Sequence, residues 1–207
     1  MRRKILIYGS IVLVSVILLS CSQRSNKKAD VSLGDKLTVH NIKVDLTESR
    51  VIWAGTLLGV YTHTGTVKFT EADLGVKKGE VTDGSFVVDL TTMVATDDNF
   101  NPEEGSTKER LIGHLSSPDF FDVKNHPTAT FIIKSAEGTS ATGDLTIRGI
   151  TNEETVENIK VENLDGKVKL SGDMVFDRKK YNVSWDYPAK DMLLKKEIEL
   201  KIELIGS

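Results

Sequence analysis

Near the C-terminus the chain reads Glu197-Ile198-Glu199-Leu200-Lys201-Ile202-Glu203-Leu204, and this stretch decides the fold class. Charged and apolar residues alternate strictly along it, so one face of the segment is apolar and the other is charged. A period of two is typical of a strand in an antiparallel sheet with one face buried and one face in water. The stretch therefore predicts an all-β protein built from antiparallel strands.

The same alternation recurs upstream, in segments separated by turn residues. Four further strands are predicted on this basis: Phe86-Val87-Val88-Asp89-Leu90, Thr130-Phe131-Ile132-Ile133-Lys134, Leu145-Thr146-Ile147-Arg148 and Lys167-Val168-Lys169-Leu170. We expect turns at the glycine-containing pairs Asp83-Gly84, Glu137-Gly138, Asp165-Gly166 and Ser171-Gly172. Several short strands at short spacing are typical of a sandwich or a barrel.

One helix is predicted, from Lys108 to Leu115, because Leu111, Ile112 and Leu115 fall on one face and Pro118 ends the segment soon after. The helix belongs to a long connection, residues 96–117, whose first half is polar and has no apolar periodicity. We expect that first half to make few packing contacts and to move, while the helix caps and gates one end of a barrel.

The N-terminus predicts export and lipid anchoring. Met1-Arg2-Arg3-Lys4 is a charged n-region, an apolar run follows over residues 5–19, and Leu18-Leu19-Ser20-Cys21 resembles a bacterial lipobox. The run is shorter than the roughly 20 residues that span a bilayer, which disfavours the alternative of an uncleaved anchor with an incidental cysteine. We predict a lipoprotein signal peptide (1–20), lipid attachment at Cys21, a flexible tether (21–36) and one barrel domain (37–207).

Composition excludes several classes of protein. Cys21 is the only cysteine, so its acylation leaves no thiol for a disulfide, a thiolate metal site or a catalytic nucleophile. The formal net charge is −3, and loss of three basic residues with the signal peptide makes it more negative by three. Basic residues are interleaved with acidic ones, which argues against nucleic-acid binding.

Three blocks of sequence resemble the YceI-like family. The most distinctive runs Asp119-Phe120-Phe121-Asp122-Val123, then Pro127-Thr128, then Thr130-Phe131; the others are Gly143-Asp144-Leu145-Thr146-Ile147-Arg148-Gly149-Ile150-Thr151 and Val87-Val88-Asp89-Leu90-Thr91-Thr92-Met93, with Thr96. The resemblance implies an eight-stranded antiparallel, lipocalin-like barrel with one short helix in a long connection near one end. It also implies an elongated apolar cavity that holds an isoprenoid chain of polyprenyl or quinone type.

The chain departs from the family pattern at two places, which bear on pocket length and headgroup preference. The family has an aromatic residue two positions after the glycine of a Gly-x-Phe motif, whereas this chain has Val67 two positions after Gly65. Towards the C-terminus Arg178 stands for the family's arginine, although the sequence beyond it matches loosely.

The predicted function is non-catalytic binding of an amphipathic, isoprenoid-like lipid inside the barrel. The protein would be lipid-anchored in the cell envelope and face the periplasm, with a membrane and a lipid as partners. Ligand contact is predicted for apolar residues of the buried faces: Trp53, Phe86, Val88, Leu90, Leu111, Leu115, Phe121, Phe131, Ile133, Leu145, Ile147 and Phe176. The alternative is a structural or interaction lipoprotein with a packed barrel that binds an envelope protein.

No metal, cofactor or catalytic site is predicted. The histidines, His40, His63, His114 and His126, lack the close spacing of zinc ligands, so we interpret them as surface or hydrogen-bonded imidazoles. The acids of the 96–117 connection lack the glycine and closing glutamate of a calcium loop. No motif pairs a nucleophile with a base.

Overall fold

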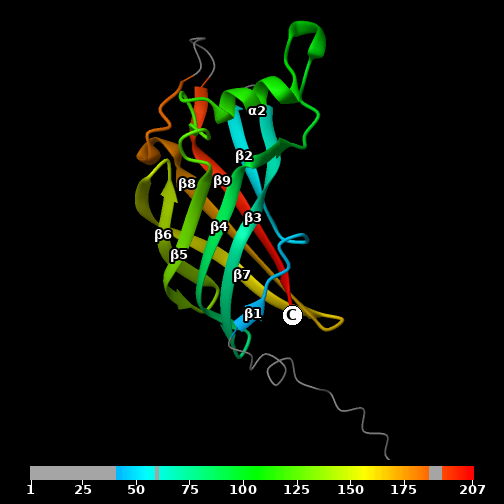
Figure 1. Cartoon of the computed structure of the whole chain (residues 1–207), viewed down its shortest axis with the longest axis vertical. Helices are drawn as coiled ribbons and strands as arrows, with labels where there is room; N and C mark the ends of the chain where they lie inside the picture. Colours follow the sequence, from blue (N-terminus) through cyan, green and yellow to red (C-terminus); the bar gives the residue numbers. More distant parts are fainter. Residues whose placement is uncertain (1–40, 59–60, 187–192) are drawn as a thin grey trace, which may run out of the picture. The chain divides into compact units, whose positions relative to one another are not determined.

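Nine strands and one α-helix make up most of the chain that the computed structural model describes, residues 41–58, 61–186 and 193–207 (Figure 1). The strands are β1 Asn41–Lys43, β2 Arg50–Leu58, β3 Tyr61–Lys77, β4 Glu80–Ala95, β5 Thr128–Glu137, β6 Ser140–Ile147, β7 Ile150–Leu164, β8 Lys167–Asp177 and β9 Leu193–Gly206. The helix is α2 Lys108–Ser116, and the 3-10 turns are η1 Pro102–Glu104 and η2 Arg178–Tyr181. The predicted signal peptide, Cys21 and the tether lie outside the described residues.

Antiparallel pairings close the sheet into an eight-stranded barrel. Hydrogen-bonded neighbours run in the order β3, β2, β9, β8, β7, β6, β5 and β4, and β4 pairs back with β3. The short β1 continues the position of β2, because Ile42 pairs with Leu74 of β3 and Val44 bridges Gly206 of β9. The barrel prediction is therefore confirmed, and of the two architectures that alternation allowed, the sandwich does not form.

Of the four turns predicted at glycine-containing pairs, two are confirmed and two are wrong. Gly138 and Gly166 adopt positive φ angles of 57° and 89° between strands, as expected. The predicted turns at Asp83-Gly84 and Ser171-Gly172 are wrong, because both pairs lie inside strands, β4 and β8. A Cβ on Gly172 would lie 2.7 Å from Val156 Cγ1, so this glycine permits close side-chain packing instead of a turn.

Gly65 of β3 lies directly beneath the indole of Trp53 on β2. The two residues are cross-strand partners, and a Cβ on Gly65 would lie 2.1 Å from the Trp53 ring and 2.0 Å from the Val94 carbonyl oxygen. Only glycine fits this position. The indole therefore packs directly on Gly65, the glycine at which the family's Gly-x-Phe motif begins.

Helix α2 lies across one end of the barrel (Figure 1), as the sequence predicted. The Thr107 hydroxyl caps it by accepting a hydrogen bond from Arg110 N at 3.2 Å, and Ser117, before Pro118, ends it. Leu115 is buried, and Leu111 and Ile112 are half-buried against the core. In the part of the chain that the structure describes, no helix is long and apolar enough to span a membrane.

Substitution of Gly65 by Ala should destabilise the fold by about 3 kcal/mol, because the added methyl overlaps both a ring and a backbone carbonyl. Gly113→Ala is the matched control: nothing lies within 4 Å of its Cβ position on α2, and the change should stabilise the helix by up to about 1 kcal/mol. Urea denaturation of the two variants measures both effects, and a Gly65→Ala variant as stable as the wild type would contradict the packing described.

Candidate functional site

The interior of the barrel contains an apolar cavity of about 200 Å³. Inward-facing side chains of all eight barrel strands line it, together with α2 and the segment that follows the helix. It extends from Leu74 and Val81, beside the β3–β4 turn, to Leu111 and Leu194 at the α2 end. Among the described lining residues, polar side chains are limited to His63 and Thr130, with the indole N–H of Trp53.

All twelve side chains predicted to contact a ligand line this cavity: Trp53, Phe86, Val88, Leu90, Leu111, Leu115, Phe121, Phe131, Ile133, Leu145, Ile147 and Phe176. The structure thus brings together residues from five strands, the helix and the loop after it. Their contact with a ligand remains a prediction.

Sequence reasoning missed other lining residues, although their signal was visible. Val67 and Phe69 alternate along β3, and Ile198, Leu200 and Ile202 belong to the very stretch that decided the fold class. Alternation placed the C-terminal residues on the buried face without showing that this face borders a hollow. Val67 is buried against the cavity where the family has an aromatic residue, so the smaller side chain leaves more space there.

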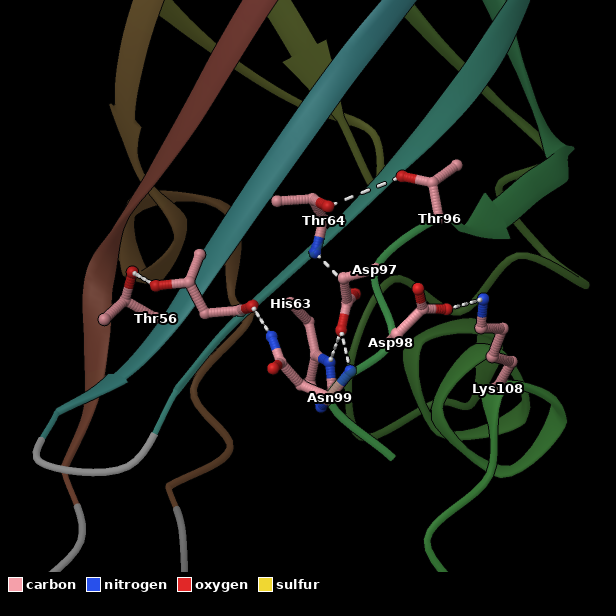
Figure 2. Close-up of polar contacts among 9 residues, drawn as sticks. Thr56, His63, Thr64, Thr96, Asp97, Asp98, Asn99 and Lys108 are labelled. Atoms are coloured by element: carbon pink, nitrogen blue, oxygen red, sulfur yellow. Dashed lines mark hydrogen bonds and ion pairs between the residues drawn. The ribbon is translucent and has the colours of Figure 1, made fainter. Parts of the chain in front are cut away.

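His63 and Asp97 form a polar pair at the α2 end of the cavity (Figure 2). The ring Nδ1 of His63 lies 3.0 Å from Asp97 Oδ1, and the two side chains are only 13% and 10% exposed. The imidazole stacks on Phe100, with ring centroids 4.7 Å apart, and tilts against Tyr61. The histidine is therefore held by a hydrogen bond at Nδ1 and by contacts with two aromatic rings.

Backbone N–H groups hold the Asp97 carboxylate in its ionised form. Burial alone would raise the pKa of Asp97, but hydrogen bonds donated by Thr64 N at 2.8 Å, by His63 and by Asn99 N at 3.0 Å together lower it below the usual value for aspartate. The contribution of this carboxylate to stability is consequently present above about pH 4 and lost as the pH falls through the lowered pKa.

These contacts correct one expectation about the 96–117 connection. The first half was expected to make few packing contacts, yet Thr96 N donates to Thr64 O, Phe100 stacks on His63, and Asn99 Nδ2 donates to Thr62 O (Figure 2). Polar residues without periodicity can be fixed by hydrogen bonds to a strand, which hydrophobic patterning does not detect. The start of the loop is therefore attached to β3.

Comparisons with known proteins agree with this geometry. The model of the YceI-like domain matches residues 42–205, which is most of the chain. The chain belongs to the YceI-like domain family. It is 32% identical over 126 residues to a UPF0312 protein of Staphylococcus aureus strain USA300, a match that covers 57% of this chain and 68% of the relative.

Two solved structures share the fold. Burkholderia cenocepacia BcnA superposes with a TM-score of 0.63 at 22% identity, over 80% of this chain and all of that one. A polyisoprenoid binding domain from Saccharophagus degradans superposes with a TM-score of 0.55 at 11% identity, over 81% of this chain and 97% of that one. At these identities the likeness extends to the barrel alone.

Arg178, which stands for the arginine of the YceI-like family, is fully buried at the α2 end. Its guanidinium donates to the carbonyl oxygens of Val183 at 2.6 Å, Trp185 at 2.7 Å and Lys195 at 3.1 Å, and to Asp186 Oδ1 at 3.0 Å. Hydrogen bonds from Lys179 and Arg178 lower the pKa of Asp186.

The same guanidinium lies over the ring of Phe120, with 5.9 Å between its central carbon and the ring centroid. Phe120 is buried, and its carbonyl oxygen accepts a hydrogen bond from Arg148. Because Phe120 also lines the cavity, Arg178 acts on the cavity wall through this ring.

Arg178→Lys should lower the free energy of unfolding by about 3 kcal/mol, because a lysine ammonium cannot satisfy acceptors spread around a planar fork. Lys179→Ala is the control: the side chain of this neighbour is paired with the half-exposed Asp186, and its loss should change stability by less than about 0.5 kcal/mol. Thermal and urea unfolding of both variants provide the comparison. Equal stability of the two variants would show that the buried guanidinium is dispensable.

Proposed function

We propose that this protein is a non-catalytic carrier of an amphipathic, isoprenoid-like lipid, of polyprenyl or quinone type, held inside the barrel. The observation that carries the proposal is the cavity, which is lined by apolar side chains from every barrel strand. A hydrocarbon chain in this space would bind mainly through burial of apolar surface, at about 25 cal/mol per Å² before ordering costs. The name of the Saccharophagus relative, a polyisoprenoid binding domain, supports the same ligand class.

The lining residues favour binding over catalysis. Among those that the structure describes, His63 is the only histidine, and none is a serine, cysteine, lysine or carboxylate. A covalent or acid–base mechanism needs a nucleophile or a second proton-transfer group beside the reacting atom. The lining supplies neither, whereas it supplies a continuous apolar wall.

The alternative was a packed barrel that binds an envelope protein through its outer face. A filled interior would have favoured that function, and the hollow interior favours the carrier. Native mass spectrometry of protein purified from a membrane-containing host tests the choice. We expect the protein to retain a bound molecule with the mass of a lipid, and to melt at a higher temperature when isoprenoids are added. Absence of both effects would contradict the carrier proposal.

Leu111→Ser should weaken lipid retention by about fivefold to tenfold, because Leu111 lines the cavity at the α2 end and its truncation removes apolar contact with the ligand. Ile112→Ser provides a matched control, since Ile112 is half-buried on the same helix without lining the cavity. Lipid retention and melting temperature are measured on both variants. Equal losses of retention would mean that α2 contributes only to the fold.

We also propose that the mature protein is anchored by lipid at Cys21 in the cell envelope and faces the periplasm. The charged n-region, the short apolar run and the lipobox-like Leu18-Leu19-Ser20-Cys21 support this proposal. Cys21→Ala should move the protein out of the membrane fraction and remove acyl chains from its N-terminal peptide, as detected by mass spectrometry. An unmodified Cys21 in membrane-bound wild-type protein would contradict it.

A further inference from the structure

His63 is the single titratable side chain among the described residues that line the cavity, and it lies at the α2 end. Its ring is hydrogen-bonded to Asp97 and contacts two aromatic rings, Phe100, stacked at an interplanar angle of 18°, and Tyr61, whose ring centroid is 4.6 Å away. Such a ring cannot turn without breaking its contacts. The direction in which each ring nitrogen points is consequently fixed.

Asp97 determines which ring nitrogen carries the proton. An ionised carboxylate can only accept hydrogen bonds, and the lowered pKa of Asp97 keeps it ionised. Nδ1 of His63, 3.0 Å from Asp97 Oδ1, must therefore be the donor. In the neutral ring Nε2 is then the acceptor.

The acceptor nitrogen has no partner within the described residues. The hydrogen bond that the His63 ring makes with a described residue is made through Nδ1, whereas Nε2, the other nitrogen bonded to Cε1, points in a different direction. The His63 side chain lines the cavity and keeps 13% of its surface exposed, which leaves space for a small polar group beside the ring. A lysine of the same cluster, Lys108, lies 5.8 Å from the centroid of the Phe100 ring and is paired with Asp98 at 3.2 Å (Figure 2).

We propose that His63, positioned by Asp97, is the polar recognition site of the cavity and accepts a hydrogen bond from the hydroxyl of a lipid alcohol or phenol. This inference rests on the proposed carrier function and specifies the ligand's polar end. A hydroxyl can donate to Nε2, whereas an ether, an ester or a quinone carbonyl of the same chain cannot. An anionic head such as a phosphate would require the doubly protonated ring instead.

The test compares three ligands that share the same farnesyl chain and differ only in their polar group: farnesol, farnesyl methyl ether and farnesyl phosphate. Each displaces a fluorescent apolar dye, N-phenyl-1-naphthylamine, from the purified domain at pH 7.5. We expect farnesol to bind about fivefold to tenfold more tightly than the ether, the factor expected of one hydrogen bond. If no ligand displaces the dye, the carrier function fails; if alcohol and ether bind equally, only this inference fails.

Three variants test whether His63 and Asp97 cause the preference for the alcohol over the ether. His63→Phe keeps the aromatic stacking and should bind alcohol and ether equally, while Asp97 keeps its backbone donors Thr64 N and Asn99 N. Asp97→Asn should reduce the preference, because an amide group can donate to Nδ1 and so no longer fixes the proton of His63. The substitution also removes one acceptor oxygen near Thr64 N and Asn99 N, so its binding of the ether serves as its own reference. His126→Phe removes a histidine that does not line the cavity and should leave the preference intact. Melting temperatures confirm that each variant is folded.

A direct spectroscopic measurement covers the case in which a variant does not fold. Nitrogen-15 chemical shifts of His63 in the wild-type protein should show a protonated Nδ1 and an unprotonated Nε2 at pH 7.5, and Nε2 should shift on addition of farnesol. A protonated Nε2, or tighter binding of farnesyl phosphate than of farnesol that is lost in His63→Phe, would overturn the proposed hydroxyl preference.

Discussion

Arg178 carries a positive charge at a position without exposure to solvent, and the α2 end of the barrel is arranged around the hydrogen bonds that this charge requires. A buried cation without partners would cost several kcal/mol, so carbonyl groups from separate segments must converge on it. Val183, Trp185 and Lys195 supply them, which holds residues 183–186 beside the first residues of β9. The ring of Phe120 lies over the same guanidinium, so this cation also positions one side chain of the cavity wall.

A hollow interior is costly in a way that a barrel can tolerate. At about 24 cal/mol per Å³ of cavity, an empty space of this size corresponds to a stability loss on the order of 5 kcal/mol. The closed ring of strand pairings satisfies the backbone hydrogen bonds without help from the interior side chains. The barrel can therefore remain folded while the cavity is empty. A hydrocarbon chain that fills the cavity would restore the van der Waals contacts that the lining side chains lack.

Sequence reasoning recovered the features that repeat along the chain and missed those that depend on one contact. Alternation predicted the strands and placed the C-terminal residues on the buried face, and the family blocks supplied barrel closure. Glycine in a turn and glycine under a side chain look identical in sequence, which is why Gly84 and Gly172 were misassigned. His63 was interpreted as an ordinary imidazole because its partner, Asp97, lies far away in sequence, across the β3–β4 hairpin.

The distribution of polar groups gives the cavity a direction. Towards the β3–β4 turn the wall consists of residues such as Leu74, Val81 and Ala141, which offer no hydrogen bond from their side chains to a ligand. A polar head placed there would lose its water without replacement, at a cost of about 1–3 kcal/mol for each unsatisfied group. The α2 end provides His63 and some access to water. An amphipathic ligand thus has one favourable orientation, with its apolar end at the closed part of the barrel and its polar end beside α2.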